Sequence, residues 1–363
     1  MATVIHQQSI SQSVPASTNR FSRISGNRRI SGNSTESTRA STWRTGGVFS
    51  NLYIIVLTND RGTSTFRTRK TTSNANQVVT ITASTTGKFE DTVNTDAVTA
   101  GDNWHYYLVT GAGGTVFTYG TTQLLFAATT NTVQKIGADA TTLSTASSTV
   151  PGPFYGDGLL NPGAADSTVG MTVRTAGTLK NLYVQVTSNA RTTTTTVVSR
   201  IASATGNLTV SIGASATGIF EDTFNSDSVS SGQLINWAAV SGTGTEALAF
   251  SIVEVDFLTT NNQSQYVNGL TAGLAQAAGV TTYYSFAGML VADTTEANQA
   301  AESNLAFTAS LLQCNISANT IVLDSTLTLR KNSGVANQTV TITAETTGIF
   351  QDTVNTDTIV ASD

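Results

Sequence analysis

A short acidic motif occurs three times and is the first candidate for chemistry. Its copies span residues 86–96, 217–227 and 347–357. Each copy has an Asp, an Asn three positions later and a second Asp two positions after that. Carboxylate and amide oxygens are the ligands that Ca²⁺ takes in proteins. The calcium candidates are therefore Asp91, Asp96, Asp222, Asp227, Asp352 and Asp357.

The same motif also has the composition of a tight turn, and we prefer this interpretation. The spacing is not that of an EF-hand loop, and one copy has Gln351 where the others have Glu. Gly87 and its counterparts Gly218 and Gly348 can take the positive φ of a sharp corner. The Asp and Asn side chains can bond their own backbone in Asx turns. We expect Phe89, Phe220 and Phe350 to pack into the core beside the corner.

The remaining reactive residues do not assemble into a catalytic pattern. The two histidines, His6 and His105, lie far apart and have no counterparts in the other copies. Adjacent carboxylates such as Glu90 and Asp91 would point to opposite faces of a strand, which is unsuitable for a glycosidase pair. The glycines at 111, 113 and 114 have no following lysine or helix, so a phosphate-binding loop is not indicated. We expect no enzyme, no cofactor and no metal.

Arginines recur beside the motif, at Arg69, Arg200 and Arg330. They could bind a carboxylate ligand in each copy, but we expect each to pair with an Asp or Glu of its own copy. Cys314 is the only cysteine, so an intrachain disulfide is impossible. It occupies an inward strand position, and we expect a core side chain rather than a nucleophile.

The repeat extends well beyond the motif, and the residues around each copy have the pattern of β-strands, which would position the motif. The pattern recurs about every 130 residues, which is the size of a whole domain. In residues 51–56, 181–186 and 311–316 the even-numbered positions are apolar in every copy, which predicts half-buried strands. Threonine-rich and β-branched stretches follow in each copy and also predict strands.

The predicted fold class is all-β, with three tandem jelly-roll-like antiparallel β-sandwiches. The predicted domains are residues 1–130, 131–261 and 262–363. The third copy runs in register until the sequence ends and lacks its last strands, so we expect it to be incomplete at its C-terminus. A sandwich without those strands would expose unpaired edges.

Two explanations of the third copy remain open. The sequence is incomplete, or another subunit supplies the strands by β-strand addition. In the second case the residues 3–11 are a candidate donor strand, and the chain would form a homo-oligomer or a head-to-tail polymer. The residues expected to contribute to assembly are Val4, Ile5, Ile10, Ile359 and Val360.

Composition limits the partners and the location. Only 11% of residues are charged, and the formal net charge is −5, which argues against general nucleic-acid binding. Arg20, Arg23, Arg28, Arg29, Arg39 and Arg44 make the start of the chain basic. A nucleic acid or an acidic partner could bind there, but we prefer a solvated loop or a subunit contact. No apolar run is long enough for a membrane span, and no signal peptide is evident. We expect synthesis in the cytoplasm, and a virion or extracellular assembly as the location.

The order of these strands resembles a known architecture. An Asn-Leu-Tyr strand, a Thr-rich strand ending in Arg, a Thr-Val-Thr-Ile strand and the Thr-Gly-x-Phe-x-Asp-Thr motif follow one another. This order resembles the jelly-roll modules of tailed-phage virion proteins, which are similar in plan to the tumour-necrosis-factor jelly roll. The resemblance implies two four-stranded sheets per copy and assembly into trimers, capsid decorations, fibres or filaments. It implies no catalytic residues.

The expected function is therefore a non-enzymatic structural protein that self-assembles, as a capsid, decoration, fibre or filament subunit of a phage or virus. Other virion proteins are further candidate partners. One alternative is a receptor- or carbohydrate-binding fibre module, for which Tyr106, Tyr119, Tyr283 and Tyr284 are the available aromatic residues. Another alternative is an extracellular prokaryotic filament subunit.

Overall fold

The computed structural model describes residues 3–16, 18–24, 36–129, 132–139, 142–155, 165–259, 262–266, 275–286, 293–361 and 363. Nearly all of its regular structure is antiparallel β, which confirms the predicted fold class. Repeats one and two belong to one compact unit, and residues 273–284 and 292–363 of repeat three form a second. No helix among the described residues is long and apolar enough to cross a membrane.

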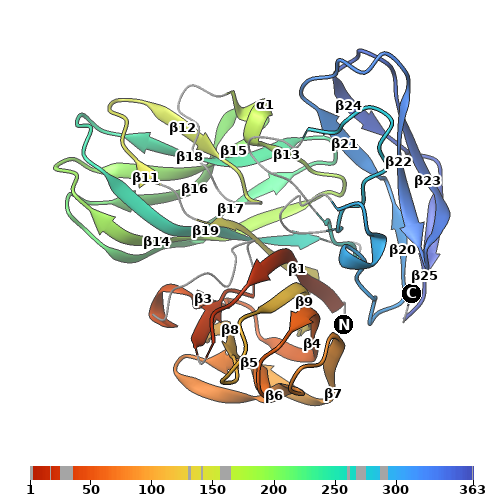
Figure 1. Cartoon of the computed structure of the whole chain (residues 1–363). Helices are drawn as coiled ribbons and strands as arrows, with labels where there is room; N and C mark the ends of the chain where they lie inside the picture. The colour runs from red at the N-terminus through yellow and green to blue at the C-terminus, as the bar shows by residue number, and fades with distance from the viewer. Residues whose placement is uncertain are drawn as a thin grey trace. The chain divides into compact units, whose positions relative to one another are not determined.

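Repeat one is a sandwich of two sheets with the strand orders β1-β9-β4-β7 and β2-β8-β5-β6 (Figure 1). Its pairings are nested: β1 pairs with β9, β2 with β8, β4 with β7 and β5 with β6. This nesting of antiparallel strands across two sheets is the jelly-roll arrangement. The bounds are β1 Thr3–Ser13, β2 Asn19–Ser22, η1 Glu36–Thr38, β3 Ser41–Thr42, β4 Gly47–Asn59, β5 Ser64–Lys70, β6 Ser73–Ile81, β7 Gly87–Val98, β8 Asn103–Val109 and β9 Phe117–Ala128.

Repeat two has the same nested strand pairing, with the sheet orders β10-β19-β14-β17 and β12-β18-β15-β16. The short strands β11 and β13 lie beside β19 and β18. The bounds are β10 Thr132–Asp139, β11 Thr142–Leu143, β12 Thr149–Gly152, α1 Asp166–Val169, β13 Met171–Thr172, β14 Gly177–Asn189, β15 Thr195–Ile201, β16 Ala204–Ile212, β17 Gly218–Val229, β18 Leu234–Ser241 and β19 Leu248–Thr259.

Repeat three shows only the inner pairs of this nested order. β20 and β21 pair with β25 and β24, as β4 pairs with β7, and β22 pairs with β23, as β5 pairs with β6. Within the described residues these are two-stranded sheets. The bounds are η2 Glu296–Asn298, β20 Phe307–Ser310, β21 Gln313–Ile316, β22 Ser325–Lys331, β23 Gly334–Ile342, β24 Gly348–Gln351 and β25 Thr356–Ile359.

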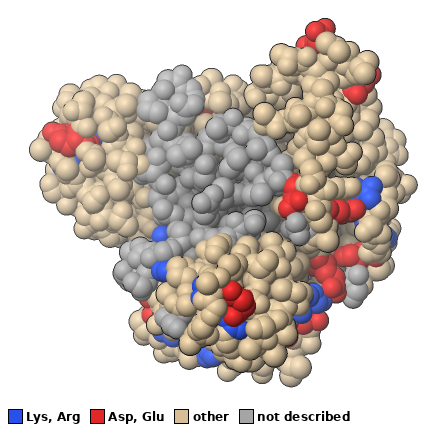
Figure 2. Space-filling model, in the orientation of Figure 1, with Lys and Arg blue, Asp and Glu red and all other residues tan. Residues whose placement is uncertain are grey.

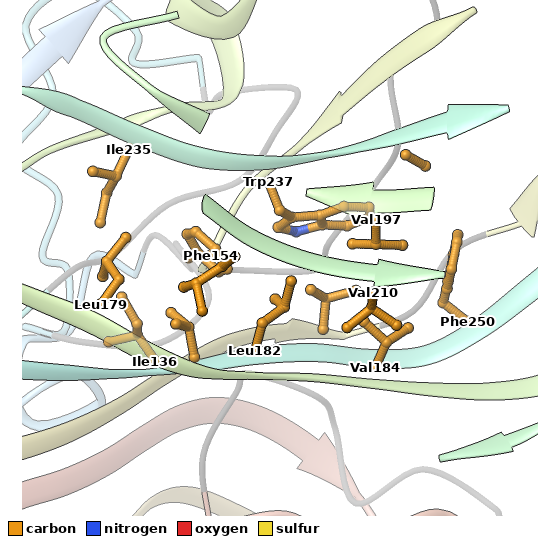
Figure 3. Close-up of a cluster of buried hydrophobic side chains, with 14 of the residues drawn as sticks. Ile136, Phe154, Leu179, Leu182, Val184, Val197, Val210, Ile235, Trp237 and Phe250 are labelled. Atoms are coloured by element: carbon orange, nitrogen blue, oxygen red, sulfur yellow. The ribbon is translucent and has the colours of Figure 1, made fainter. Parts of the chain in front are cut away.

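The core of each complete sandwich lies between its two sheets. In Figure 3, Leu182 and Val184 of one sheet of repeat two face Trp237 and Val197 of the other. The predicted inward positions are confirmed in β4 and β14, where Leu52, Ile54, Val56, Leu182, Val184 and Val186 are all buried. The prediction that these strands are only half-buried is wrong, because Tyr53, Tyr183 and Gln185 on the opposite face are buried as well. Sheet faces in contact exclude water from these side chains, and their burial is the main stabilising contribution of the sandwich.

The outer surface is dominated by uncharged side chains. In Figure 2, charged atoms form small groups separated by wide uncharged areas on the face shown. This agrees with the low charged fraction of 11%. Threonine, serine and asparagine on the outward positions of strands account for this surface.

Candidate assembly site

Each copy of the acidic motif forms a bulge on an edge strand. In repeat one, residues 92–94 of β7 stand opposite Asn51 alone on β4. Asn51 has a φ of +53°, which Asn tolerates better than most residues. The positive φ predicted for the motif glycines is confirmed: it is +107° at Gly87, +111° at Gly218 and +116° at Gly348.

The first aspartate of the motif holds the bulge through four hydrogen bonds. Asp91 Oδ1 accepts bonds from the backbone N–H groups of Val93 and Asn94, at 3.1 and 3.0 Å. Asp91 Oδ2 accepts bonds from Asn94 Nδ2 and from the backbone N–H of Val78, both at 2.9 Å. Asp222 and Asp352 accept the equivalent bonds at 2.8 to 3.1 Å. The Asx-turn interpretation is therefore confirmed in all three repeats.

The second aspartate joins the same strand to the other sheet. Asp96 Oδ1 accepts a bond from the backbone N–H of Asn76 on β6 at 2.6 Å, and Oδ2 accepts one from Thr68 Oγ1 on β5 at 2.5 Å. Asp227 and Asp357 bond the corresponding edge-strand N–H groups. β6 and β7 are the outer strands of their sheets, so the two carboxylates satisfy edge N–H groups that would otherwise face solvent. We call Asp91, Asn94 and Asp96, with their counterparts, the edge clamp.

Hydrogen bonding controls the charge of the first clamp aspartate. Burial alone would raise the pKa of Asp91, but the bonds from Asn94 and from the backbone outweigh it and hold the pKa below its usual range. The pKa of Asp222 is lowered against burial in the same way. In Asp352 the bonds from Asn355 are the largest cause and lower the pKa. These three carboxylates are therefore ionised at neutral pH.

The donors around the clamp favour the turn over the calcium interpretation. Asp91 and Asp96 face N–H and O–H groups, which point hydrogens at the carboxylate oxygens. A cation would compete with these hydrogens for the same lone pairs. Across the described ranges there is no group of three or more His, Cys, Asp and Glu residues arranged to hold a metal.

The tip of each bulge carries an apolar side chain in solvent. Val93, Phe224 and Val354 are 86%, 96% and 85% exposed. The phenylalanines earlier in the motif differ, since Phe89 and Phe220 pack partly buried against the cores of their repeats. A bulge at the edge of a sheet interrupts the straight strand that another edge would need for pairing.

The repeated arginines pair with acidic residues of their own repeats, as predicted. Arg69 Nε lies 2.6 Å from Glu36 Oε1, and Arg330 Nε lies 2.7 Å from Glu296 Oε1. Arg200 Nη2 lies 2.8 Å from Asp166 Oδ2. The partners come from η1, α1 and η2 rather than from the acidic motif. Each pair fastens the segment that precedes β4, β14 or β20 to the strand β5, β15 or β22 of the same repeat.

Two arginines of the basic start of the chain, Arg23 and Arg39, are buried, which corrects the prediction of a solvated loop for these residues. Arg23 is 3% exposed, and its Nη2 donates to Gln185 Oε1 at 2.6 Å and to Ser251 Oγ at 2.9 Å in repeat two. Arg44 forms an ion pair with Glu221, also in repeat two. Arg39 is buried as well, while Arg28 and Arg29 lie outside the described residues. Arg23 and Arg44 therefore join two repeats of one chain.

A buried ion pair lies in the same region. Lys135 Nζ on β10 is 3.0 Å from Asp256 Oδ1 on β19, and both side chains are almost fully buried. Burial alone would lower the pKa of Lys135, but Asp256 and Glu254 outweigh it and raise the pKa. Ser41 Oγ of repeat one donates to Glu254 Oε1 at 2.7 Å. This cluster was not predicted, because its charged members lie on two strands far apart in sequence and Ser41 comes from the other repeat.

Repeat three has an inner face that is only partly covered. Leu312, Cys314 and Ile316 are partly exposed, although their counterparts in β4 and β14 are buried. Leu327 of β22 is also partly exposed, whereas the equivalent Phe66 and Val197 are 0% exposed. The edge clamp, in contrast, is intact in repeat three. One side of this sandwich is therefore closed, and we call the side formed by β20, β21 and β22 the open side.

Beside the open side, repeat three also differs from the other two repeats at one position that is a buried arginine in both of them. Arg61 is 3% exposed, and its guanidinium donates to backbone oxygens of Val14 and Thr115. Arg191 is fully buried and donates to Gly244, Leu143 and Thr145 oxygens. Thr115 and Gly244 lie before the last strand of their repeats, Val14 follows β1, and Leu143 and Thr145 lie at the end of β11 and just after it. Repeat three has Ile321 at this position. The contrast could have been predicted by aligning the three repeats.

Comparison with known proteins adds no family to this description. No protein-family model matches the chain, and no curated protein matches it significantly.

The remaining chemical candidates are packed into the structure. Burial, with a contribution from Lys135, lowers the pKa of His6 to about 3, and burial lowers the pKa of His105 to about 4 despite Glu36. Burial raises the pKa of the Cys314 thiol to about 11, so it is a poor nucleophile. Of the aromatic residues considered for ligand binding, Tyr106 and Tyr119 are buried in the core. Tyr283 and Tyr284 are partly exposed.

The residues expected to contribute to assembly fall into two groups. Val4 and Ile5 are buried in β1, which pairs with β9 of its own repeat, so the predicted donor strand already has a place in this chain. Ile10 is also on β1, but its side chain lies outside the described residues. Ile359 is buried on β25, and Val360 is 50% exposed beside it.

Proposed function

We propose that this chain is a non-enzymatic structural protein that assembles with further copies of itself, with strands of one subunit completing a sandwich of another. We further propose that the assembly is a virion component, such as a capsid, decoration, fibre or filament subunit. Jelly rolls are common building blocks of virus shells, which supports this second step by analogy.

The observation that carries the proposal is the contrast between the two sides of repeat three. The clamp side has a bulge and bonded edge N–H groups. On the open side, β20 and β21 contain no charged residue, and β22 has none before Arg330. Natural edge strands are usually blunted by charges, prolines or bulges. The open side therefore has the sequence of interior strands, and such strands bind another strand.

Electron microscopy of the purified chain, with light scattering at the same concentrations, tests the proposal. Ordered particles, filaments or discrete oligomers are the expected result. A matched pair of variants is available on β22, where Leu327 points inward and Thr326 is exposed. Leu327→Glu should reduce assembly, and Thr326→Glu should leave it nearly unchanged. Monomers at every concentration would overturn the proposal.

A further inference from the structure

A lysine and an aspartate of repeat two lie buried against each other on neighbouring strands. Lys135 on β10 stands directly opposite Asp256 on β19, with 3.0 Å between Nζ and Oδ1. Their side chains are 1% and 2% exposed. The two atoms are in contact but are not aligned as a hydrogen bond. The carboxyl carbon of Asp256 is one bond beyond Oδ1, so an amine and a carboxyl carbon are held close together.

The fold of a repeat does not require charged residues at these two positions. In repeat one the equivalent pair on β1 and β9 is Ile5 and Leu125, and both side chains are buried. A buried ion pair is often no more stabilising than such an apolar pair, because both charges lose their hydration. Two reactive groups at a place where an apolar pair is sufficient indicate a role beyond packing.

The groups beside the pair are those that formation of an amide requires. Asn181 Nδ2 donates to Asp256 Oδ2 at 2.8 Å, and this donor would stabilise negative charge on that oxygen when the carboxyl carbon is attacked. Glu254 is 0% exposed and lies two residues from Asp256, on the same face of β19. It covers Gly137, the second residue after Lys135, where a Cβ would lie 2.5 Å from Glu254 Cγ. A carboxylate in this place can accept a proton from the amine and pass it on.

Repeat one covers the pair and excludes water from it. The ring of Trp43 lies 5.7 Å from Lys135 Nζ, and Trp43 is 1% exposed. Ser41 donates to Glu254 from the same segment. Burial disfavours charged forms, so moving a proton from Nζ to Oδ1 costs less here than in water. This transfer creates the neutral amine, which is the nucleophilic form of lysine.

We propose that Lys135 and Asp256 condense within the folded chain to an amide bond that joins the first and last strands of repeat two. Nζ passes one proton to Oδ1, and its lone pair then attacks Cγ to form the C–N bond. Glu254 carries a second proton from Nζ to Oδ1, the Cγ–Oδ1 bond breaks, and Oδ1 leaves as water. An ammonium and a carboxylate become an amide and water, so the net charge of the site is unchanged. The fixed contact of the two groups supplies the proximity that this reaction lacks in solution.

The mass of the denatured full chain measures this bond directly. We expect the wild-type chain to be lighter than its sequence by one molecule of water, and Lys135→Arg to have its full sequence mass. Trypsin should no longer cleave after Lys135, and the fragments that contain Lys135 and Asp256 should remain joined. A wild-type chain of full sequence mass, or a water loss that maps to other residues, would overturn the proposal.

Two matched variants separate the reaction from the fold. Lys180 stands opposite Asp256 on the other side, on β14, but is exposed, so Lys180→Arg should still lose one water. Lys135→Ile combined with Asp256→Leu copies the buried pair of repeat one, and it should fold and keep its full mass. Water loss that persists in this double variant, or that disappears in Lys180→Arg, would contradict the assignment.

Glu254→Gln tests the proton transfer itself. The side chain keeps its shape and an oxygen for Ser41, but it can no longer accept the proton of Nζ. We expect water loss to be at least about 100-fold slower, which mass spectrometry of freshly synthesised chains over time measures. Water loss at the wild-type rate would exclude Glu254 from the reaction and refute the proposed mechanism.

Discussion

Replacing the first aspartate of one edge clamp tests whether the motif holds the sandwich closed. In Asp222→Asn, one carboxylate oxygen becomes an NH₂ group that faces the donors on Oδ2, the Thr209 N–H at 2.8 Å and Asn225 Nδ2 at 2.9 Å. A hydrogen bond to a charged group contributes about 1.5–3 kcal/mol. Two hydrogen bonds are lost, and hydrogen bonds to water at the sheet edge recover part of their free energy. We therefore expect a loss of about 3 kcal/mol in the free energy of unfolding.

Urea unfolding followed by tryptophan fluorescence measures this loss, because Trp237 lies in the core of repeat two. The matched control is Thr223→Ala, an exposed residue of the same bulge, which should change the free energy of unfolding by less than about 0.5 kcal/mol. If Asp222→Asn unfolds at the same urea concentration as Thr223→Ala, the clamp does not stabilise the repeat and the reasoning fails.

Four further outcomes are expected. Asp91 and Asp222 have folded pKa values below their unfolded value of about 3.9, so their contribution to stability is complete well above that pH and is lost as the pH falls through the folded values. Urea unfolding should therefore give a lower free energy of unfolding at pH 3 than at pH 7, and this difference should be smaller in Asp222→Asn. Lys135→Met should cost about 3–5 kcal/mol because it leaves Asp256 buried without its cation, and a thermal melt unchanged from wild type would contradict this. Arg191→Ile, which copies repeat three, should cost about 2–4 kcal/mol through unsatisfied carbonyls, measured by urea unfolding with Arg200→Lys as the milder comparison. Leu311→Asn should stabilise repeat three by about 0.5–1 kcal/mol, because Leu311 has a φ of +63° where the other repeats have Asn; a lower melting temperature would count against it.

The strands and the turn chemistry could be predicted because they depend on short-range patterns. Alternating apolar residues such as Leu52, Ile54 and Val56 identify a half-buried strand, and Gly followed by Asp and Asn identifies a bonded turn. The nested pairing was accessible only through the resemblance to jelly rolls, because pairing joins strands from opposite ends of a repeat. The predicted pairing of Arg69 with an acidic residue of its own repeat was confirmed, but the sequence did not identify Glu36 as the partner.

The buried polar contacts between repeats could not be predicted from composition. Arg23 looks like a surface residue in a basic stretch, and its burial depends on Gln185 and Ser251, which lie far away in the chain. The linking role of the clamp was also missed. Asp96 was considered as a cation ligand, whereas its oxygens bond an edge N–H and Thr68 across the two sheets. Which donor faces a carboxylate is a property of the folded sandwich and has no signature in the motif itself.

The nested strand pairing also sets an order of folding during synthesis. The inner strands β4 to β7 leave the ribosome together, and their pairs join segments that are close in sequence. The outer pair of β1 and β9 spans nearly the whole repeat, so it must wait for the end of the domain. The inner half is the part that repeat three displays, with its clamp bonds complete. A nascent chain can therefore form this half early, and the clamp blocks one of its edges against pairing with other chains while the remaining strands are still being made.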